Sequence, residues 1–163
     1  MLKLLTRQRA AILILVVALA TIGGAWIFES LGYSPCPLCL KQRWPYYAAM
    51  VLALAAAGLS SSYPKASTAL LYVLAAVFVA SAVFGVFHSG VEWKWWPGPD
   101  TCDGDFSGGL PDLSKPAVRC DEAAIRIFGL SLAGWNAVIS AAMACVALLG
   151  ARAHGSSSVS QYR

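Results

Sequence analysis

Four stretches of this sequence contain no Asp, Glu, Lys or Arg, and they constrain its fold more than any other feature. They cover residues 10–28, 44–64, 66–91 and 127–151. Each is close to or above the ~20 apolar residues that a helix needs to cross the hydrocarbon core of a bilayer. Backbone groups find no water there, so such spans form helices. The sequence therefore predicts an all-α membrane protein, a bundle of four transmembrane helices.

The remaining residues leave no room for a separate soluble domain. The chain has 163 residues, of which only 12% are charged, whereas soluble domains carry about 25%. We expect one integral membrane domain over residues 1–151 and a disordered tail over 152–163. The expected spans are about 10–30, 44–62, 67–88 and 127–150, and the two external loops are about 31–43 and 89–126.

The first apolar stretch has an alternative interpretation as a signal peptide. Basic residues precede it, and the Ala-Leu-Ala sequence at 18–20 resembles a cleavage site. The apolar run continues to Phe28, which is longer than the core of a usual signal peptide. We therefore interpret it as a retained transmembrane helix.

Four spans place both termini on one side of the membrane. The basic N-terminus favours the cytoplasm for that side, and disulfides persist outside the cytoplasm. Each side carries six basic residues, and all eight acidic residues lie with the two loops, but acidic residues are weak topology signals. We predict cytoplasmic termini and external loops. No basic cluster with interleaved aromatics accompanies the +4 charge, so nucleic acid is not an expected partner.

Two pairs of cysteines fall in the two loops, on the same expected side. Cys36 and Cys39 flank a Pro-Leu pair in the first loop, and Cys102 and Cys120 lie in the second. The thiolate is the reactive form of cysteine, and a helix N-terminus or a nearby cation such as Arg43 lowers the thiol pKa. Two dithiols can exchange electrons by thiolate attack through a mixed disulfide. These four cysteines are the candidate catalytic residues.

The alternatives to a redox role for the cysteines are a structural disulfide and a metal site. The first pair could be a structural disulfide or half of a zinc site, but zinc would need two more ligands. Cys102 and Cys120 could supply them, yet no second close Cys pair or His pair supports that site, so we expect no metal. As a staple, the second pair would contribute ~3 kcal/mol, but the Gly- and Pro-rich run between its cysteines has little core to stabilise.

The electron acceptor must be small and membrane-soluble. The sequence has no Rossmann glycine pattern, haem motif or flavin signature, and a quinone fits the remaining requirements. Arg43 is a permanent cation with several hydrogen-bond donors, which suits a quinone oxygen. His88, at the end of the third apolar stretch, could donate to the same ring. The alternatives are a headgroup anchor for Arg43 and an ordinary interfacial histidine for His88.

Two local patterns concern packing. The segment 91–96 alternates charge with tryptophan, and tryptophan favours the membrane–water boundary, so we expect an interfacial segment against membrane lipid at the base of the second loop. Small residues let membrane helices approach closely. Gly85 on the third span and a stripe of Ala137, Ala141 and Cys145 on the fourth are therefore expected at helix contacts.

The run Cys-Pro-Leu-Cys-Leu-Lys-Gln-Arg at 36–43 resembles the Cys-x-x-Cys-x-x-x-Arg signature of the bacterial disulfide bond formation protein B family. The loop with Cys102 and Cys120 matches that family's second external loop. The segment 128–131, together with Trp135, is similar to the start of its fourth helix. The resemblance covers about residues 13–149.

The resemblance implies a four-helix bundle in the bacterial inner membrane, with the cysteine loops in the periplasm. One bundle with one site suffices for this activity, so we expect a monomer. Such a protein-dithiol:quinone oxidoreductase reoxidises a periplasmic thioredoxin-like dithiol oxidase (DsbA-like) and sustains disulfide bond formation, with ubiquinone or menaquinone as acceptor. The resemblance also implies a role for each residue. Cys102 forms a mixed disulfide with the partner, and Cys120 exchanges with Cys36. Cys39 faces the quinone with Arg43 beside it, and His88 lies near a family position before the second loop.

Two rival functions remain. A vitamin-K-epoxide-reductase-like enzyme is also a four-helix bundle with two cysteine pairs, but its Cys-x-x-Cys usually falls late in the chain, whereas residues 36–39 fall early. A non-enzymatic membrane module would keep both pairs as structural disulfides, inert to mild dithiols.

Overall fold

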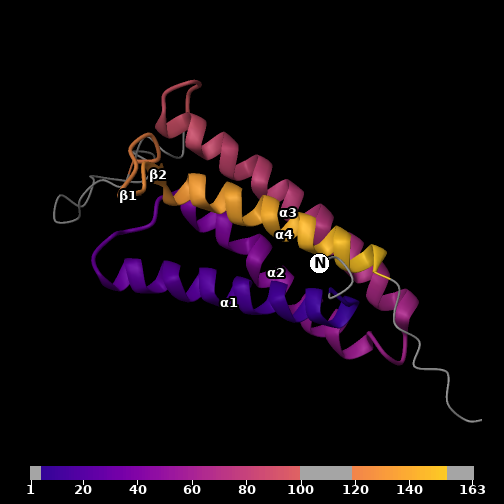
Figure 1. The fold of residues 1–163 in the computed structure, drawn as a ribbon. Helices are drawn as coiled ribbons and strands as arrows, with labels where there is room; N and C mark the ends of the chain where they lie inside the picture. The colour runs from indigo at the N-terminus through magenta and orange to yellow at the C-terminus, as the bar shows by residue number, and fades with distance from the viewer. Residues whose placement is uncertain (1–4, 100–118, 154–163) are drawn as a thin grey trace, which may run out of the picture.

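The computed structural model describes residues 5–99 and 119–153, and within them the chain is mostly helical (Figure 1). The helices are α1 (Arg7–Ser30), α2 (Pro37–Leu59), α3 (Pro64–Glu92) and α4 (Leu132–Arg152). A short antiparallel pair of strands, β1 (Arg126–Ile127) and β2 (Leu130–Ser131), precedes α4. The described residues contain four helices, as predicted, and three of them, α1, α3 and α4, are long and apolar enough to cross a membrane.

Helix α2 differs from the expected second span because it begins earlier. We expected a loop up to residue 43, but Pro37 lies in the first turn of the helix and Pro45 lies inside it. A proline is favourable in a first turn because its φ angle suits the helix and its missing N–H is not needed there. Lys41 and Arg43 consequently lie within α2, which is not among the three helices apolar enough to span.

The start of α4 also differs from expectation, since residues 127–131 were placed in the fourth span. The backbone instead turns at Phe128 and Gly129, whose φ angles are 51° and 82°. Positive φ at both central residues is the signature of a tight turn between antiparallel strands. Ser131 then caps the helix, its Oγ accepting a hydrogen bond from the N–H of Gly134 at 3.1 Å.

The two ends of the bundle carry different parts of the chain. At one end Arg7 donates a hydrogen bond to the carbonyl of Ala153 at 3.3 Å, joining the start of α1 to the end of α4. The α2–α3 turn lies at this end as well (Figure 1). The α1–α2 connection, the end of α3 and the β1–β2 hairpin lie at the opposite end. The described segments that carry Cys36, Cys39 and Cys120 thus lie at one end of the bundle. The orientation of the bundle in a membrane stays a prediction.

Helices α3 and α4 make the most extensive contact in the bundle. The expected close approach at Gly85 is confirmed, because this residue lies directly against the backbone of Ala137. The rest of the predicted stripe is wrong: Ala141 and Cys145 are exposed. Ser140, on the neighbouring face of α4, is fully buried instead. Its hydroxyl donates a hydrogen bond to Oγ of Ser81 on α3 at 2.9 Å.

Replacing Gly85 by alanine should destabilise the bundle. A Cβ atom there would lie 2.9 Å from the backbone nitrogen of Ala137 and 3.0 Å from its Cα, and because these are backbone atoms the helices must move apart. Overpacking of this kind costs ~1–3 kcal/mol. The matched control is Gly58→Ala, where no atom lies within 4 Å and alanine favours the helix. The free energies of unfolding in detergent should separate the two variants; equal values would contradict the close packing.

Candidate redox site

The first cysteine pair forms a disulfide at the start of α2. The Cα atoms of Cys36 and Cys39 are 5.0 Å apart. Cys36 is the N-cap residue of the helix, and its Sγ accepts a hydrogen bond from the N–H of Cys39 at 3.1 Å. Cys36 is only 3% exposed, whereas Cys39 is half-buried. The two sulfurs therefore have different surroundings, although they belong to the same bond.

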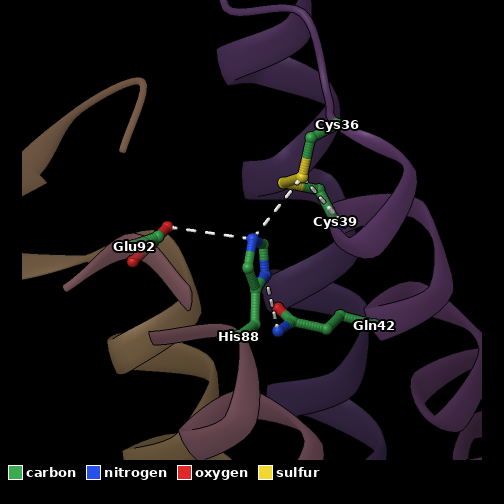
Figure 2. The surroundings of a disulfide bond; sticks show 5 residues. All are labelled: Cys36, Cys39, Gln42, His88 and Glu92. Carbon is green, nitrogen blue, oxygen red and sulfur yellow. Dashed lines mark hydrogen bonds and ion pairs between the residues drawn. A yellow bond between two sulfur atoms is a disulfide. The ribbon is translucent and has the colours of Figure 1, made fainter. Parts of the chain in front are cut away.

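His88 from α3 lies against the buried sulfur, as Figure 2 shows. Its Nε2 is 3.6 Å from Sγ of Cys36, and its Nδ1 is 3.1 Å from the amide nitrogen of Gln42. Because an amide nitrogen only donates, Nδ1 accepts this hydrogen bond, and the proton of the neutral ring is on Nε2. The imidazole, 1% exposed, thus directs an N–H toward the sulfur of Cys36.

Glu92 completes this buried polar group one helical turn further along α3. Its Oε1 is 3.9 Å from Nε2 of His88, and its side chain is 6% exposed. The side chain of Ser131 also hydrogen-bonds to it, while its Oε2 has no hydrogen-bond partner. A carboxylate beside a histidine stabilises the protonated ring, as in other proton-transfer sites.

Cys120 from the second loop packs against this group. It is 1% exposed and shares a buried cluster with Cys36, Leu38 and Val91. Cys120 is disulfide-bonded; Cys102, its expected partner, lies outside the described residues. The structure therefore brings one cysteine of the second loop next to the first pair.

An ion-pair group holds the chain beside Cys120. Asp121 accepts hydrogen bonds from Nε and Nη2 of Arg119 at 2.9 and 2.8 Å, and Nζ of Lys94 lies 3.4 Å from its carboxylate. The hydrogen bond from Arg119 is the main cause that lowers the pKa of Asp121 to about 2. Asp121 thus stays ionised at any physiological pH, and the tether between this segment and the end of α3 does not titrate there.

A cavity of about 250 Å³ opens on the other side of the disulfide, between α1, α2 and α4. Cys39, Gln42 and Arg43 line it from α2, and its other walls are largely apolar and include Phe28 and Trp135. An engineered apolar cavity of ~150 Å³ already holds benzene, so one substituted ring fits here. Cys39 and Arg43 thus line the same cavity, whereas His88 does not.

Arg43 is held at the cavity by an ion pair that the sequence analysis did not anticipate. Its Nη1 donates to Oε2 of Glu29 at 2.9 Å, and its side chain is 14% exposed. The residues expected at the site from the sequence did not include Glu29, Gln42 or Glu92. A usable signal existed for the last two, because Gln42 follows Cys39 by three residues and Glu92 follows His88 by four, the spacings that place side chains on one helical face.

The fold and the site define a helical membrane protein with a disulfide set beside a histidine and a small cavity. The family model described as "Disulfide bond formation protein DsbB" matches residues 7–150, and the chain belongs to this family. It therefore has an oxidoreductase role in disulfide bond formation.

Individual relatives agree with this family. The chain is 31% identical over 145 residues to disulfide bond formation protein B of Burkholderia pseudomallei, covering 82% of this chain and 83% of the relative. It is 28% identical over 139 residues to the protein of the same name from Polaromonas sp., covering 77% and 79%. No solved structure matches the chain significantly.

Proposed function

We propose that this protein is a protein-dithiol:quinone oxidoreductase of the bacterial inner membrane. It takes two electrons from a periplasmic thioredoxin-like (DsbA-like) dithiol oxidase and passes them through Cys102–Cys120 and Cys36–Cys39 to ubiquinone or menaquinone. One observation carries the proposal: the Cys36–Cys39 disulfide lies between Cys120, packed on the side of Cys36, and a cavity that opens at Cys39. Electrons can thus enter at one sulfur and leave at the other.

The exchange between the two pairs follows from this placement. The thiolate of Cys120 attacks Sγ of Cys36, so that a Cys36–Cys120 disulfide forms and Cys39 leaves as a thiolate. When Cys102 attacks Cys120 in turn, Cys36 is released as a thiolate. The N–H of His88 on Nε2, 3.6 Å from this sulfur, stabilises the negative charge, and Glu92 stabilises the ring if it is protonated.

The cavity suits a quinone ring. Its walls are largely apolar, while the sulfur of Cys39 and the guanidinium of Arg43 supply an electron donor and a cation at one end. A bound quinone accepts two electrons and two protons and becomes a quinol. Cys36 and Cys39 lose the same two electrons when they re-form their disulfide, and their thiol protons balance the two taken up. Arg43 stabilises the thiolate of Cys39 and an adjacent oxygen.

Replacing Arg43 by alanine should raise the quinone concentration that gives half-maximal rate by about tenfold or more. A hydrogen bond to a charged group contributes ~1.5–3 kcal/mol, and 1.4 kcal/mol corresponds to tenfold. The matched control is Lys41→Ala, which removes an exposed cation of the same helix that does not line the cavity. Quinone titrations at saturating partner should distinguish the variants; equal shifts for both would remove Arg43 from the quinone site.

The test of the whole proposal uses the purified protein in detergent with a reduced thioredoxin-like dithiol oxidase. The thiols of this partner are followed while ubiquinone or menaquinone is supplied. Re-oxidation that requires both the protein and a quinone is the expected result. If both cysteine pairs instead stay oxidised in the presence of mild dithiols, the disulfides are structural and the protein is not this oxidase.

A further inference from the structure

We propose that Cys36 and Cys39, once reduced, form a binding site for one Zn²⁺ ion together with His88 and Glu92. The sequence alone offered a zinc site only if two further ligands could be found for the first pair. The fold supplies them from α3, on the side of the disulfide away from the cavity residues. The proposal needs only a reducible pair, so it does not depend on the identity of the quinone or of the partner protein.

The ligand atoms of both cysteines and of His88 already lie close enough to share one metal ion. Glu92 lies outside this close group and has to turn its carboxylate toward the sulfurs to complete the site. Zinc binds sulfur at ~2.3 Å and nitrogen or oxygen at ~2.0–2.2 Å, so neighbouring ligand atoms are about 3.3–3.8 Å apart. Sγ of Cys36 is 3.6 Å from Nε2 of His88, and that nitrogen is 3.9 Å from Oε1 of Glu92. The ligand atoms of Cys36, Cys39 and His88 all lie within 4.8 Å of one another. In Figure 2 the disulfide and Glu92 both face the same ring nitrogen of His88.

The charge and burial of Glu92 favour a cation at this point. Its side chain is 6% exposed and its Oε2 has no hydrogen-bond partner. A buried carboxylate is costly unless it is paired or binds a metal. Two thiolates balance the charge of Zn²⁺, and the neutral imidazole and an oxygen of Glu92 complete a four-ligand set of two sulfurs, one nitrogen and one oxygen.

Gln42 can support either protonation form of His88. Zinc requires the lone pair of Nε2, so the ring proton must move to Nδ1 and find an acceptor there. The amide of Gln42 lies 3.1 Å from Nδ1, and rotation of this amide by half a turn presents its oxygen instead of its nitrogen. Metal-bound histidines commonly donate their second N–H to such a group.

The site is gated by the redox state of the cysteines. Reduction of the disulfide adds two electrons and two protons, and zinc binding then displaces both thiol protons. The disulfide has no thiolate and binds no zinc. In the reduced state the metal would hold both sulfurs away from Cys120 and from the cavity, so Zn²⁺ should inhibit turnover by trapping the reduced enzyme.

Zinc binding can be measured directly on protein in which Cys102 and Cys120 are replaced by serine, so that only the first pair can supply thiolates. The pair is reduced with a phosphine, the reductant is removed without air, and Zn²⁺ is titrated in competition with a zinc indicator. One Zn²⁺ per chain is expected for the reduced protein and none for the oxidised protein. Co²⁺ in the same site should show thiolate charge-transfer absorption and tetrahedral bands.

The zinc affinities of substituted proteins distinguish this four-ligand site from simple chelation of zinc by the two thiolates. Loss of an outer partner alone weakens metal sites by ~10–100-fold, so loss of a ligand in Glu92→Gln or His88→Ala should weaken zinc binding by at least about tenfold. Glu122→Gln, which removes an exposed carboxylate of the segment that carries Cys120, and Glu92→Asp, which keeps the carboxylate, are the matched controls. Equal affinity in all variants, or no zinc bound to a fully reduced pair, overturns the proposal and leaves the quinone-linked function untouched.

Discussion

Replacing Cys39 by serine should abolish turnover and leave a disulfide between Cys36 and Cys120. The free thiol of Cys36 can attack the Cys102–Cys120 disulfide, which forms the Cys36–Cys120 bond and releases Cys102 as a thiol, with no external oxidant. The exchange is favoured because Cys36 and Cys120 belong to one buried cluster. Without Cys39 no thiolate can be released toward the cavity, so electrons cannot leave.

Mass spectrometry of peptides from the non-reduced protein measures this link. Cys36→Ser is the matched control: it should be equally inactive, and it should form less of the corresponding Cys39–Cys120 link, because Cys39 is half-buried at the rim of that cluster. A link to Cys39 in one variant, with none to Cys36 in the other, would reverse the proposed order of the two sulfurs.

Replacing His88 by alanine should reduce turnover by about 10²–10⁴-fold, the range for loss of a positioned acid or base. The released thiolate of Cys36 would lose the N–H that faces it at 3.6 Å. The variant should also be less stable by ~1–3 kcal/mol, because the buried amide of Gln42 loses its partner. Turnover and the free energy of unfolding are measured on the same preparations.

A second substitution separates the chemical role of His88 from its structural role. Asparagine in place of His88 can still donate a hydrogen bond but cannot exchange a proton at physiological pH. We expect His88→Asn to recover part of the lost stability while its turnover stays low. If stability and turnover recover together, a hydrogen-bond donor at this position is sufficient and proton exchange by His88 is not required.

The parts of the fold that could be predicted from the sequence are those set by composition along the chain. The uncharged stretches around 10–28 and 66–91 correspond to α1 and α3, since length and apolarity alone make a membrane helix. The pairing of Cys36 with Cys39 was predictable because the residues are close in sequence. Arg43 lies one helical turn after Cys39 because the helix already begins at Pro37, whereas the sequence predicted a loop up to residue 43.

The remaining features depend on contacts between distant segments. The hairpin before α4 requires a positive φ at Phe128. Aromatic residues rarely adopt this conformation, so the sequence pattern does not predict the hairpin. His88 was expected at the quinone site but lies against Cys36, because the rotation of α3 about its axis is set by packing on α2 and α4. Glu92 is a buried carboxylate in a segment that was expected to be interfacial, and only the packed fold gives it a partner.

The most direct test of the account is a balance of electrons under strictly anaerobic conditions. Purified protein is mixed with a known amount of reduced thioredoxin-like dithiol oxidase and excess quinone, and quinol and partner disulfide are both quantified, with Cys39→Ser in parallel. The account predicts one quinol for each partner disulfide with the unaltered protein and no quinol above background with Cys39→Ser. Quinol formation that survives loss of Cys39, or partner oxidation without quinol, would contradict transfer through the Cys36–Cys39 pair.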